Sequence, residues 1–449
     1  MTETAIVILA AGKGTRMKSR LPKVLHAIAG QPLLHHVVAT ARGLGPERLV
    51  LVLGPDMAEV GAALPQGSPE VEIAEQTKRL GTGHALLMAE PALADFSGDV
   101  VVLYGDVPLI TGETLRALLA RRQSSGAALV VLAFEPEDSA AYGRLVLGSD
   151  GSLECIVERL DADEATAAIT LCNSGIMAVS GAHLFGLLKA LDNNNAKGEY
   201  YLTDIVAAAR GLGLDCVHAM ASEEEVMGIN DRVQLAEAEA ALQGRLRRAA
   251  MENGATLIDP ATTWFSSDTV LGEDVIVGPN TVFGPGVRVA DNVEIRAFCH
   301  LEGAEVSSGA IIGPYARLRP GAEIGEGARV GNFVEVKKAR VEKGAKINHL
   351  SYIGDARVGA GANIGAGTIT CNYDGYAKSL SDIGAGAFIG SNSALVAPVV
   401  IGDGAVVAAG SVITRDVAAD AIAVARGKQS EYAGAAAKRR TKLESRRKK

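Results

Sequence analysis

Short apolar runs alternate with helix-spaced segments in the first half of the chain. The runs cover 5–9, 49–53, 99–103, 128–134 and 176–179, and each has the length and apolar character of a strand buried in a parallel sheet. Between them, the segments at 33–41 and 115–119 place their apolar residues on one helix face. This alternation predicts an α/β domain with a mainly parallel sheet.

Two further elements complete the first half. Residues 145–157 carry Gly148-Ser149-Asp150-Gly151 near their centre, which predicts a hairpin. Residues 230–251 contain no Pro, are rich in Ala, Glu, Leu and Arg, and lead into Asn253-Gly254, which predicts one long helix with glycine at its end. We expect this helix to link two domains stiffly.

From residue 271 onward the period changes to six. With one threonine and three slips of one residue, the recurring apolar positions are Leu271, Val277, Phe283, Val289, Ile295, Leu301, Val306, Ile312, Leu318, Ile324, Val330, Val336, Val341, Ile347, Ile353, Val358, Ile364, Thr370, Ile383, Ile389, Leu395, Ile401, Val407 and Ile413. Such a period is typical of the hexapeptide class of parallel β-helix. The gap at 371–382 predicts a loop that projects from the regular coils.

Length and charge narrow the class of protein. A chain of 449 residues exceeds one typical domain, and its net charge of -8 does not indicate a large surface for nucleic acid. Its apolar runs are too short to span a membrane and no signal-peptide pattern opens it, so we expect a cytoplasmic protein. Five scattered cysteines without a C-x-x-C pair predict reduced thiols. The basic segment 438–449 predicts a solvated, disordered tail, with nonspecific contact to an anion as the alternative.

A glycine-rich turn follows the first predicted strand. It reads Ala10-Ala11-Gly12-Lys13-Gly14-Thr15-Arg16-Met17, with Leu21-Pro22-Lys23 shortly after. It lacks the third glycine of a dinucleotide-binding turn and is too compact for a P-loop. Backbone amides and cations at the carboxyl end of a strand favour a phosphate chain, although such turns also occur without a ligand.

The sequence Tyr104-Gly105-Asp106 ends another buried run. A carboxylate in that position, beside a glycine that permits close approach, suits a magnesium ion held together with phosphate oxygens. The alternative is a turn aspartate that caps the helix expected after Pro108.

Cations, an imidazole and a phenol gather in three segments of the hexapeptide region, at 317–321, 332–338 and 348–352. If each coil consists of three hexapeptides, His349 stacks one coil after Gly331, and this stacking would bring His349, Arg319 and their neighbours onto one ridge. The alternative to a reactive site is a histidine at a coil corner with solvated cations around it.

Together these motifs resemble the nucleotide-sugar pyrophosphorylases. The match is closest with the bacterial family of bifunctional N-acetylglucosamine-1-phosphate uridylyltransferases and glucosamine-1-phosphate N-acetyltransferases, and it extends along the whole chain. The motifs that carry it are the glycine-rich turn with Pro22-Lys23, Gln76, Gly81-Thr82-Gly83-His84, Tyr104-Gly105-Asp106-Val107-Pro108, Asn193-Asn194-Asn195, Gly198-Glu199-Tyr200-Tyr201, Asn363 and residues 366–375. Asn173-Ser174-Gly175 departs from the family's usual Asn-Thr-Gly but keeps a hydroxyl.

The resemblance implies an α/β architecture. A Rossmann-like nucleotidyltransferase domain at 1–229 is joined by a helix at 230–253 to a left-handed parallel β-helix of hexapeptide repeats at 254–449, which carries the basic tail. Family members trimerise with acetyl-CoA bound between subunits, so we expect a homotrimer.

The resemblance also implies residue roles in the first domain. Leu9, Ala10, Ala11, Gly12, Arg16 and Lys23 would meet the UTP phosphates, with Arg16 and Lys23 as catalytic cations. Gln76, Gly81 and Thr82 would recognise uracil, and Gly143, Glu158 and Asn173 would hold the sugar. Tyr104 and Gly105 would also line the nucleotide-sugar site, and Asp106 and Asn230 would bind Mg²⁺.

In the second domain, the resemblance implies that Arg319, Lys337, Tyr352 and Asn363 hold glucosamine-1-phosphate. His349 would be the general base that takes a proton from the amine as it attacks acetyl-CoA. The acetyl-CoA contacts would be Ala366, Asn372, Tyr373, Ser391, Ala409 and Arg426.

The leading hypothesis is therefore a bifunctional transferase. It would acetylate glucosamine-1-phosphate and then transfer UMP from UTP, giving UDP-N-acetylglucosamine and pyrophosphate for cell-wall precursors, peptidoglycan and lipopolysaccharide. The alternative is a monofunctional sugar-1-phosphate nucleotidyltransferase with a scaffolding β-helix. A structural assembly protein would leave the glycine-rich turn and Asp106 unexplained.

Overall fold

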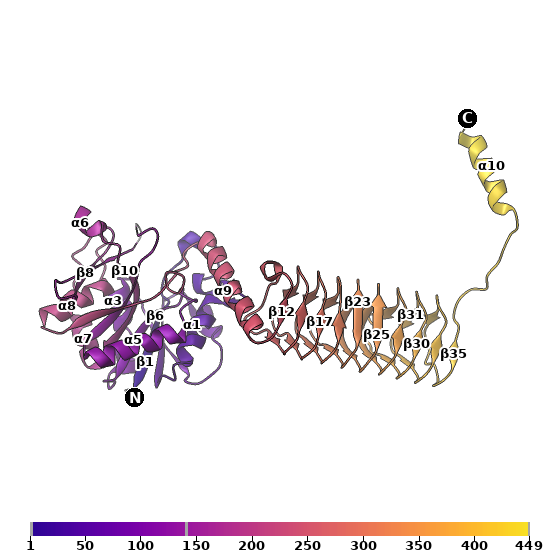
Figure 1. Cartoon of the computed structure of the whole chain (residues 1–449), viewed down its shortest axis with the longest axis horizontal. Coiled ribbons are helices and arrows are strands. Elements are labelled where there is room, and N and C mark those ends of the chain that lie inside the picture. The colour runs from indigo at the N-terminus through magenta and orange to yellow at the C-terminus, as the bar shows by residue number, and fades with distance from the viewer. Residues whose placement is uncertain (1–2, 140–141, 448–449) are drawn as a thin grey trace. The chain divides into compact units, whose positions relative to one another are not determined.

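The computed structural model describes residues 3–139 and 142–447, which form two compact units (Figure 1). The first unit is Met1–Leu246 and the second is Arg247–Lys449. The boundary between them falls inside helix α9 (Arg232–Glu252), which is the long helix that the sequence predicts.

The first unit is built on a mainly parallel sheet, as predicted. Its main path runs β11–β7–β10–β6–β1–β4–β5, and β10 alone on this path is antiparallel to its neighbours. In chain order the strands are β1 (Thr4–Leu9), β4 (Arg48–Leu53), β5 (Val71–Glu75), β6 (Asp99–Tyr104), β7 (Leu129–Phe134), β10 (Cys172–Ser180) and β11 (Cys216–Met220). The predicted hairpin is present as β8 (Arg144–Leu147) and β9 (Leu153–Val157).

The strands β5 and β11 escape prediction from the sequence because both lie at edges of the sheet. Their residues are half-buried or exposed for the most part, so they lack the continuous apolar run that marks a central strand. The two-stranded β2 (Ala27–Ile28) and β3 (Gln31–Pro32) form a separate small sheet.

Helices cover both faces of the main sheet. One face packs against α3 (Thr82–Leu87), α4 (Glu90–Leu93), α7 (Gly181–Lys189) and α8 (Ile205–Gly211). The other face packs against α1 (Leu33–Arg42), α2 (Ala58–Ala62) and α5 (Gly112–Ser125). Short elements outside these layers are α6 (Glu164–Ala167), η1 (Thr15–Met17), η2 (Lys23–Leu25) and η3 (Leu202–Asp204). The unit is thus a three-layer α/β domain with its core on both sides of the sheet.

The second unit is a left-handed parallel β-helix. It begins with β12 and the short η4 (Pro260–Thr262), and its strands stack along one axis from β12 to β35 (Figure 1). One column contains β12 (Thr256–Leu257), β14 (Ile276–Val277), β17 (Glu294–Ile295), β20 (Ile311–Ile312), β23 (Arg329–Asn332), β25 (Lys346–His349), β27 (Asn363–Ile364), β30 (Phe388–Ile389), β33 (Val406–Val407) and β35 (Ile422–Ala423).

The remaining strands of the second unit form two further columns, which the long strands β24 and β26 join into one sheet. They are β13 (Val270–Leu271), β15 (Val282–Phe283), β16 (Arg288–Val289), β18 (His300–Leu301), β19 (Ala304–Val306), β21 (Arg317–Leu318), β22 (Ala322–Ile324), β24 (Glu335–Val341), β26 (Tyr352–Val358), β28 (Ile369–Cys371), β29 (Ser381–Ile383), β31 (Ala394–Val396), β32 (Val399–Ile401) and β34 (Val412–Ile413).

The six-residue period identifies the interior of the prism. Every predicted position from Val277 to Ile413 is buried, and only Leu271, near the start, is half-buried. The register slips also appear in the pairing. Val277 pairs with Ile295, three full hexapeptides later, whereas Ile295 pairs with Ile312, one residue short of that spacing. The predicted loop is present between Cys371 and Ser381.

The C-terminal segment differs from the prediction. Residues Ala435–Arg447 form helix α10 with every residue exposed. Up to Arg447 the expectation of a solvated segment is confirmed and that of disorder is wrong, because Ala, Lys, Arg and Leu are strong helix formers. Residues 448–449 of the predicted tail lie outside the described part of the chain. All five cysteines, Cys155, Cys172, Cys216, Cys299 and Cys371, are free thiols, as expected. Within 3–139 and 142–447, no helix combines the length and the apolar character that a membrane crossing needs.

Candidate functional site

The glycine-rich turn lies at the carboxyl edge of the central strands. Leu9 of β1 pairs with Tyr104 of β6, so the turn after β1 and Asp106 after β6 meet at one edge. Gly105 packs behind the turn, where an added Cβ would lie 3.1 Å from Cβ of Ala10. The glycine in this position therefore permits the close approach that the sequence suggested.

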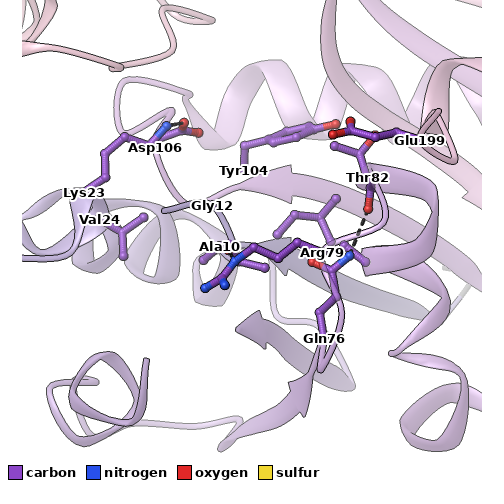
Figure 2. A pocket seen from close by; sticks show the side chains of 14 residues that line it. Ala10, Gly12, Lys23, Val24, Gln76, Arg79, Thr82, Tyr104, Asp106 and Glu199 are labelled. Carbon is purple, nitrogen blue, oxygen red and sulfur yellow. Dashed lines mark hydrogen bonds and ion pairs between the residues drawn. The ribbon is translucent and has the colours of Figure 1, made fainter. Parts of the chain in front are cut away.

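A cavity of about 300 Å³ opens at this edge (Figure 2). Of the residues predicted for the nucleotide-sugar site, those that line it are Leu9, Ala10, Ala11, Gly12, Lys23, Gln76, Gly81, Thr82, Tyr104 and Asp106. Gly105 lies behind the wall, and Arg16, Gly143, Glu158, Asn173 and Asn230 lie outside the lining. The cavity thus unites segments that are far apart in the sequence of the first unit.

Lys23, Asp106 and Asn230 converge at one end of the cavity. The Nζ atom of Lys23 forms an ion pair with Asp106 and donates to Oδ1 of Asn230 at 3.3 Å. Arg16 donates to the same Oδ1 atom at 2.9 Å. Figure 2 shows Lys23 and Asp106 pointing toward one another. The capping alternative for Asp106 is wrong, because Thr111 is the residue that caps α5.

This convergence fits a divalent cation. The Asp106 carboxylate and the Asn230 amide oxygen both reach a single positively charged atom, Nζ of Lys23. Carboxylate and amide oxygens are hard donors, and Mg²⁺ is commonly held by one or two of them together with substrate phosphates. Within the described part of the chain, no group of three or more His, Cys, Asp or Glu side chains forms a metal cluster. The residues therefore suit an ion that substrate phosphates help to hold.

Gln76 and Thr82 line another part of the cavity. Gln76 is buried, and its Nε2 donates to the carbonyl oxygen of Gly81 at 3.0 Å and contacts Nδ1 of His84 at 3.1 Å. Burial lowers the pKa of His84, so its neutral ring accepts this hydrogen bond at pH 7. These two contacts orient the amide and leave Oε1 of Gln76 as an acceptor.

Gly81 is required by the backbone next to it. Its φ is 113°, and an added Cβ would lie 2.5 Å from the carbonyl oxygen of Tyr200. The segments pair through their amides, with Gly83 donating to Tyr200 at 2.9 Å and Tyr200 donating to Leu80 at 2.8 Å. Two motifs of the resemblance, 81–84 and 198–201, are therefore one structural unit.

Tyr104 connects the cavity to the remaining predicted sugar residues. An added Cβ on Gly175 would lie 2.7 Å from its ring, and Asn173 accepts from the Gly175 amide at 2.9 Å. The hydroxyl of Ser174, which stands where the family usually has threonine, donates to the carbonyl oxygen of Leu132 at 2.6 Å. Burial, followed by the charges of Asp106 and Glu158, raises the pKa of Tyr104, so the phenol stays protonated and can donate.

Acidic side chains cluster around Glu158. Its carboxylate accepts from Thr203 at 3.1 Å, and an added Cβ on Gly143 would lie 3.7 Å from it. Burial, with Asp192, Glu158 and Asp161 nearby, raises the pKa of Asp204 to about 6. Gly143 and Glu158 are therefore neighbours, as a shared sugar-binding role requires.

Four lining residues were missed from the sequence: Val24, Arg79, Ala85 and Glu199. Arg79 donates from Nε to the carbonyl oxygen of Ala11 at 2.8 Å and so fixes the glycine-rich turn. The signal for it was present, because Lys78 and Arg79 directly precede the Gly81 turn. Glu199 belongs to the motif at 198–201, for which the resemblance implies no residue role.

In the second unit, the polar residues divide between the two sheets of the prism. His349 ends β25 and pairs with Asn332 of β23, whereas Arg319 follows β21 and Lys337 lies within β24, in the other sheet. The prediction of a single ridge is wrong, because Arg319 and His349 are 30 residues apart, which is not a whole number of coils of 17 or 18 residues. The residue that stacks beneath His349 is Asn332, because the coil here is one residue shorter than three hexapeptides. Tyr352 begins β26, shortly after the turn that follows His349.

A second hollow of about 420 Å³ lies beside Tyr352. Its walls include Tyr315, Phe333 and Leu350 together with Glu335. Glu335 accepts from Nη1 of Arg319 at 2.7 Å. The hollow thus has an apolar side formed by corner residues and a charged side formed by strand residues.

The projecting loop brings a further cation to this region. Lys378 lies beside Lys337, whose ammonium lowers the pKa of Lys378. Two adjacent ammonium groups are a favourable place for a phosphate. No local pattern pointed to Lys378, because its position depends on the path of the loop. Asn363, the fourth residue predicted for the sugar phosphate, lies on β27 in the sheet that also contains His349, and its register partner is Lys346 of β25.

The residues predicted for acetyl-CoA lie along the later coils and the loop. Asn372 is buried and donates to Asp355, and the hydroxyl of Tyr373 donates to the carbonyl oxygen of Gly375 at 2.6 Å. Arg426 donates to the carbonyl oxygen of Ala409 at 2.7 Å. Ala366 and Ser391 each accept a hydrogen bond from the following coil. The amide of Asn392 donates to the carbonyl oxygen of Ala366 at 2.8 Å, and the amide of Gly410 donates to that of Ser391 at 2.8 Å.

Comparison with known proteins matches both units. The profile of the MobA-like NTP transferase domain matches residues 6–199, and that of the bacterial transferase hexapeptide (six repeats) matches 268–303, 303–338 and 381–415. A protein of Paramagnetospirillum magneticum named "Bifunctional protein GlmU" is 59% identical over 434 residues, which cover 96% of each chain. A protein of the same name from Rhodospirillum rubrum is 58% identical over 99% of this chain and 98% of its own. Another, from Xanthobacter autotrophicus, is 58% identical over 94% of each chain.

Proposed function

Because the chain belongs to the family of bifunctional GlmU proteins, we propose that each of its two units performs one of the family's two reactions with the residues described above. The second unit acetylates glucosamine-1-phosphate with acetyl-CoA. The first unit then transfers UMP from UTP to the product, which gives UDP-N-acetylglucosamine and pyrophosphate. The product is the sugar nucleotide that we assign to cell-wall precursor synthesis in the cytoplasm.

In acetyl transfer, the substrate amine attacks the thioester carbonyl of acetyl-CoA. Nε2 of His349 takes the amine proton, a C–N bond forms, the C–S bond breaks and CoA leaves. Arg319, Lys337, Tyr352 and Asn363 hold the sugar phosphate. Backbone donors near Asn372 and Tyr373 stabilise the oxyanion, and Ala366, Ser391, Ala409 and Arg426 contact acetyl-CoA.

In uridylyl transfer, the sugar phosphate attacks the α-phosphorus of UTP and pyrophosphate leaves. No covalent enzyme intermediate is needed, so catalysis consists of alignment and of neutralising two anions. Arg16, Lys23 and the amides of the glycine-rich turn supply positive charge to the phosphates. Glu158, Asn173 and Gly143 hold the sugar.

Recognition of uracil follows from the orientation of Gln76. Its Nε2 is occupied by Gly81 and His84, which leaves Oε1 as an acceptor. Uracil offers an N3–H donor, whereas cytosine has an acceptor there, so the amide favours UTP over CTP.

Asp106 and Asn230 would hold Mg²⁺, which supplies charge neutralisation for the phosphates and the leaving pyrophosphate. Lys23 forms an ion pair with Asp106 at the same place. A phosphate chain that enters the cavity meets Lys23, Arg16 and the turn amides at the same end, so these residues align it against the sugar.

The assignment of two activities rests on the reactive and charged side chains of the second unit. An exposed imidazole, the phenol of Tyr352 and two adjacent ammonium groups lie on the β-helix, and a spacer needs none of them. The monofunctional alternative, with a scaffolding β-helix, is therefore not favoured.

The experiment that tests this assignment measures CoA release. Purified protein with acetyl-CoA and glucosamine-1-phosphate, but without UTP, should release CoA, because the β-helix acts independently of uridylyl transfer. Glucose-1-phosphate, which has no amine, is the control and should release none. Absence of amine-dependent release from folded protein would reduce the β-helix to a scaffold.

A column of corner residues supports a homotrimer. The rings of Phe298, Tyr315 and Phe333 stack with centroids 4.7 and 5.1 Å apart, and all three have positive φ. They are 46–56% exposed and continue into Leu350 at 61%. A continuous exposed apolar column is unusual for a monomer. Another subunit that covers it would also lie beside the hollow at Tyr352.

Phe333→Asn should weaken the trimer and, with it, acetyl transfer. Asparagine tolerates positive φ, so the turn is kept while the apolar contact is lost. Sedimentation velocity should show smaller species at low protein concentration, and uridylyl transfer should be unchanged. Val400→Asn, which replaces an exposed residue of the same β-helix outside the column, is the control. An unaltered sedimentation profile for Phe333→Asn across concentrations would exclude the column from the interface.

A further inference from the structure

Asn332 and His349 occupy the same position in successive coils. Asn332 is the last residue of β23, His349 is the last residue of β25, and the register pairs them. Each is followed by a residue with positive φ, Phe333 at 56° and Leu350 at 51°, so the chain turns alike after both. The amide of Leu350 also donates to the carbonyl oxygen of Asn332 at 3.0 Å. The backbone thus holds the two side chains next to one another.

The two side chains are joined by a short hydrogen bond. Nδ1 of His349 lies 2.6 Å from Oδ1 of Asn332. An amide oxygen accepts but cannot donate, so Nδ1 carries the proton in this arrangement. In a neutral imidazole, Nε2 then carries the free lone pair. Among the residues that the structure describes, Asn332 is the only hydrogen-bond partner of this ring.

The partner is an amide and not a carboxylate, and this difference has a chemical consequence. A carboxylate in contact with Nδ1 orients the ring but also favours the imidazolium form. An amide orients the ring without adding charge. Glu335, a carboxylate three residues after Asn332, is not the partner of the ring, since it forms an ion pair with Arg319 at 2.7 Å. A base must be neutral when it takes a proton, and an amide adds no negative charge that would stabilise the imidazolium.

We propose that Asn332 is a positioning residue for acetyl transfer. It accepts the hydrogen bond from Nδ1 of His349 and so keeps the lone pair on Nε2, where the substrate amine delivers its proton. The proposal rests on the role of His349 as general base. It adds that the tautomer of the ring is set by the preceding coil.

The first measurement is steady-state kinetics of acetyl transfer with Asn332→Ala. We expect kcat to fall by about 10- to 100-fold, as when the hydrogen-bond partner that orients a functional histidine is removed. KM for glucosamine-1-phosphate and for acetyl-CoA should stay within about twofold of the unchanged protein, because Asn332 holds neither substrate. Unchanged KM values report that the β-helix site is folded, and uridylyl transfer in the same samples reports the amount of intact protein. A kcat within about twofold of the unchanged protein would overturn the proposal.

The second measurement is the pH profile of Asn332→Asp. Aspartate accepts the same hydrogen bond, so kcat at high pH should recover to within a few-fold of the unchanged protein. Because the carboxylate favours imidazolium, the acidic limb of the profile should move to higher pH by about one pH unit. Asn332→Ala should show no such recovery. An acidic limb that stays in place in Asn332→Asp would contradict the proposed contact.

Asn348→Asp is the matched control. It places the same charge on the residue directly before His349, but Asn348 is not the partner of Nδ1, which contacts Asn332. We expect little movement of its acidic limb. A movement as large as that of Asn332→Asp would mean that charge alone, without the hydrogen bond, explains the result, and would overturn the positioning role.

A double variant separates this proposal from the assignment of His349 as general base, on which it rests. In the His349→Ala background, Asn332→Ala should have no further effect, because its action passes through the imidazole. A further loss there would assign Asn332 a different role and overturn the proposal. If instead His349→Ala alone keeps full acetyl transfer, the general-base assignment fails, which is a separate result.

Discussion

His349→Ala should lower kcat for acetyl transfer by at least about 100-fold, since a positioned general base contributes roughly two to four powers of ten. Uridylyl transfer should keep its rate, because its residues lie in the other compact unit. The ring is exposed and stacks on Asn332 of the preceding coil, so its loss leaves the β-helix core intact. CoA release with glucosamine-1-phosphate and pyrophosphate release with UTP and N-acetylglucosamine-1-phosphate, measured on one preparation, check both statements.

His300→Ala is the matched control for this variant. His300 is also an exposed histidine of the β-helix, on β18, and should leave both rates unchanged. If folded His349→Ala loses both activities together, the two reactions are not carried by separate sites. If it loses neither, another group is the base.

The repeat could be predicted from the sequence almost completely. A prism interior accepts one branched aliphatic side chain per turn, so each coil repeats the same physical constraint, and a constraint that recurs in every coil is visible without a structure. Val277 and Ile413, near the two ends of the pattern, are both buried as predicted. The sheet of the first unit was predicted equally well where its strands are central, and not at its edges β5 and β11.

The candidate sites were predictable only in part. Lys23, Asp106 and Gln76 follow strands or turns with a distinct local sequence, so their meeting at one sheet edge follows from the topology. Arg79 reaches Ala11 through its long side chain, and no local pattern specifies where such a side chain ends.

In the β-helix, a slip of one residue in the repeat decided which side chains meet. The slip before Val341 shortens the coil by one residue, and Asn332 instead of Gly331 therefore supports His349. Lys378 depends on the path of the projecting loop. Such features require the three-dimensional register, because the period alone is uncertain by one residue per coil.

Asp106→Asn should lower kcat for uridylyl transfer by about 100- to 1,000-fold, comparable with the loss of one preorganised electrostatic group, and leave acetyl transfer unchanged. The carboxylate is the one anionic group among the atoms that meet Nζ of Lys23 in the described part of the chain. An amide of the same shape keeps the packing while removing the charge that would hold Mg²⁺. The concentration of Mg²⁺ needed for half-maximal rate should therefore rise.

KM for UTP should not rise in this variant, because Asp106→Asn removes a negative charge from a site for anions and frees Lys23 to meet the phosphates. A fall in kcat with unchanged or lower KM would separate a role in charge neutralisation from a role in substrate binding. Asp95→Asn, at an exposed aspartate outside the cavity lining, should change neither constant. A rise in KM without loss of kcat, or an unaltered Mg²⁺ dependence, would show that Asp106 orients Lys23 and does not hold the ion.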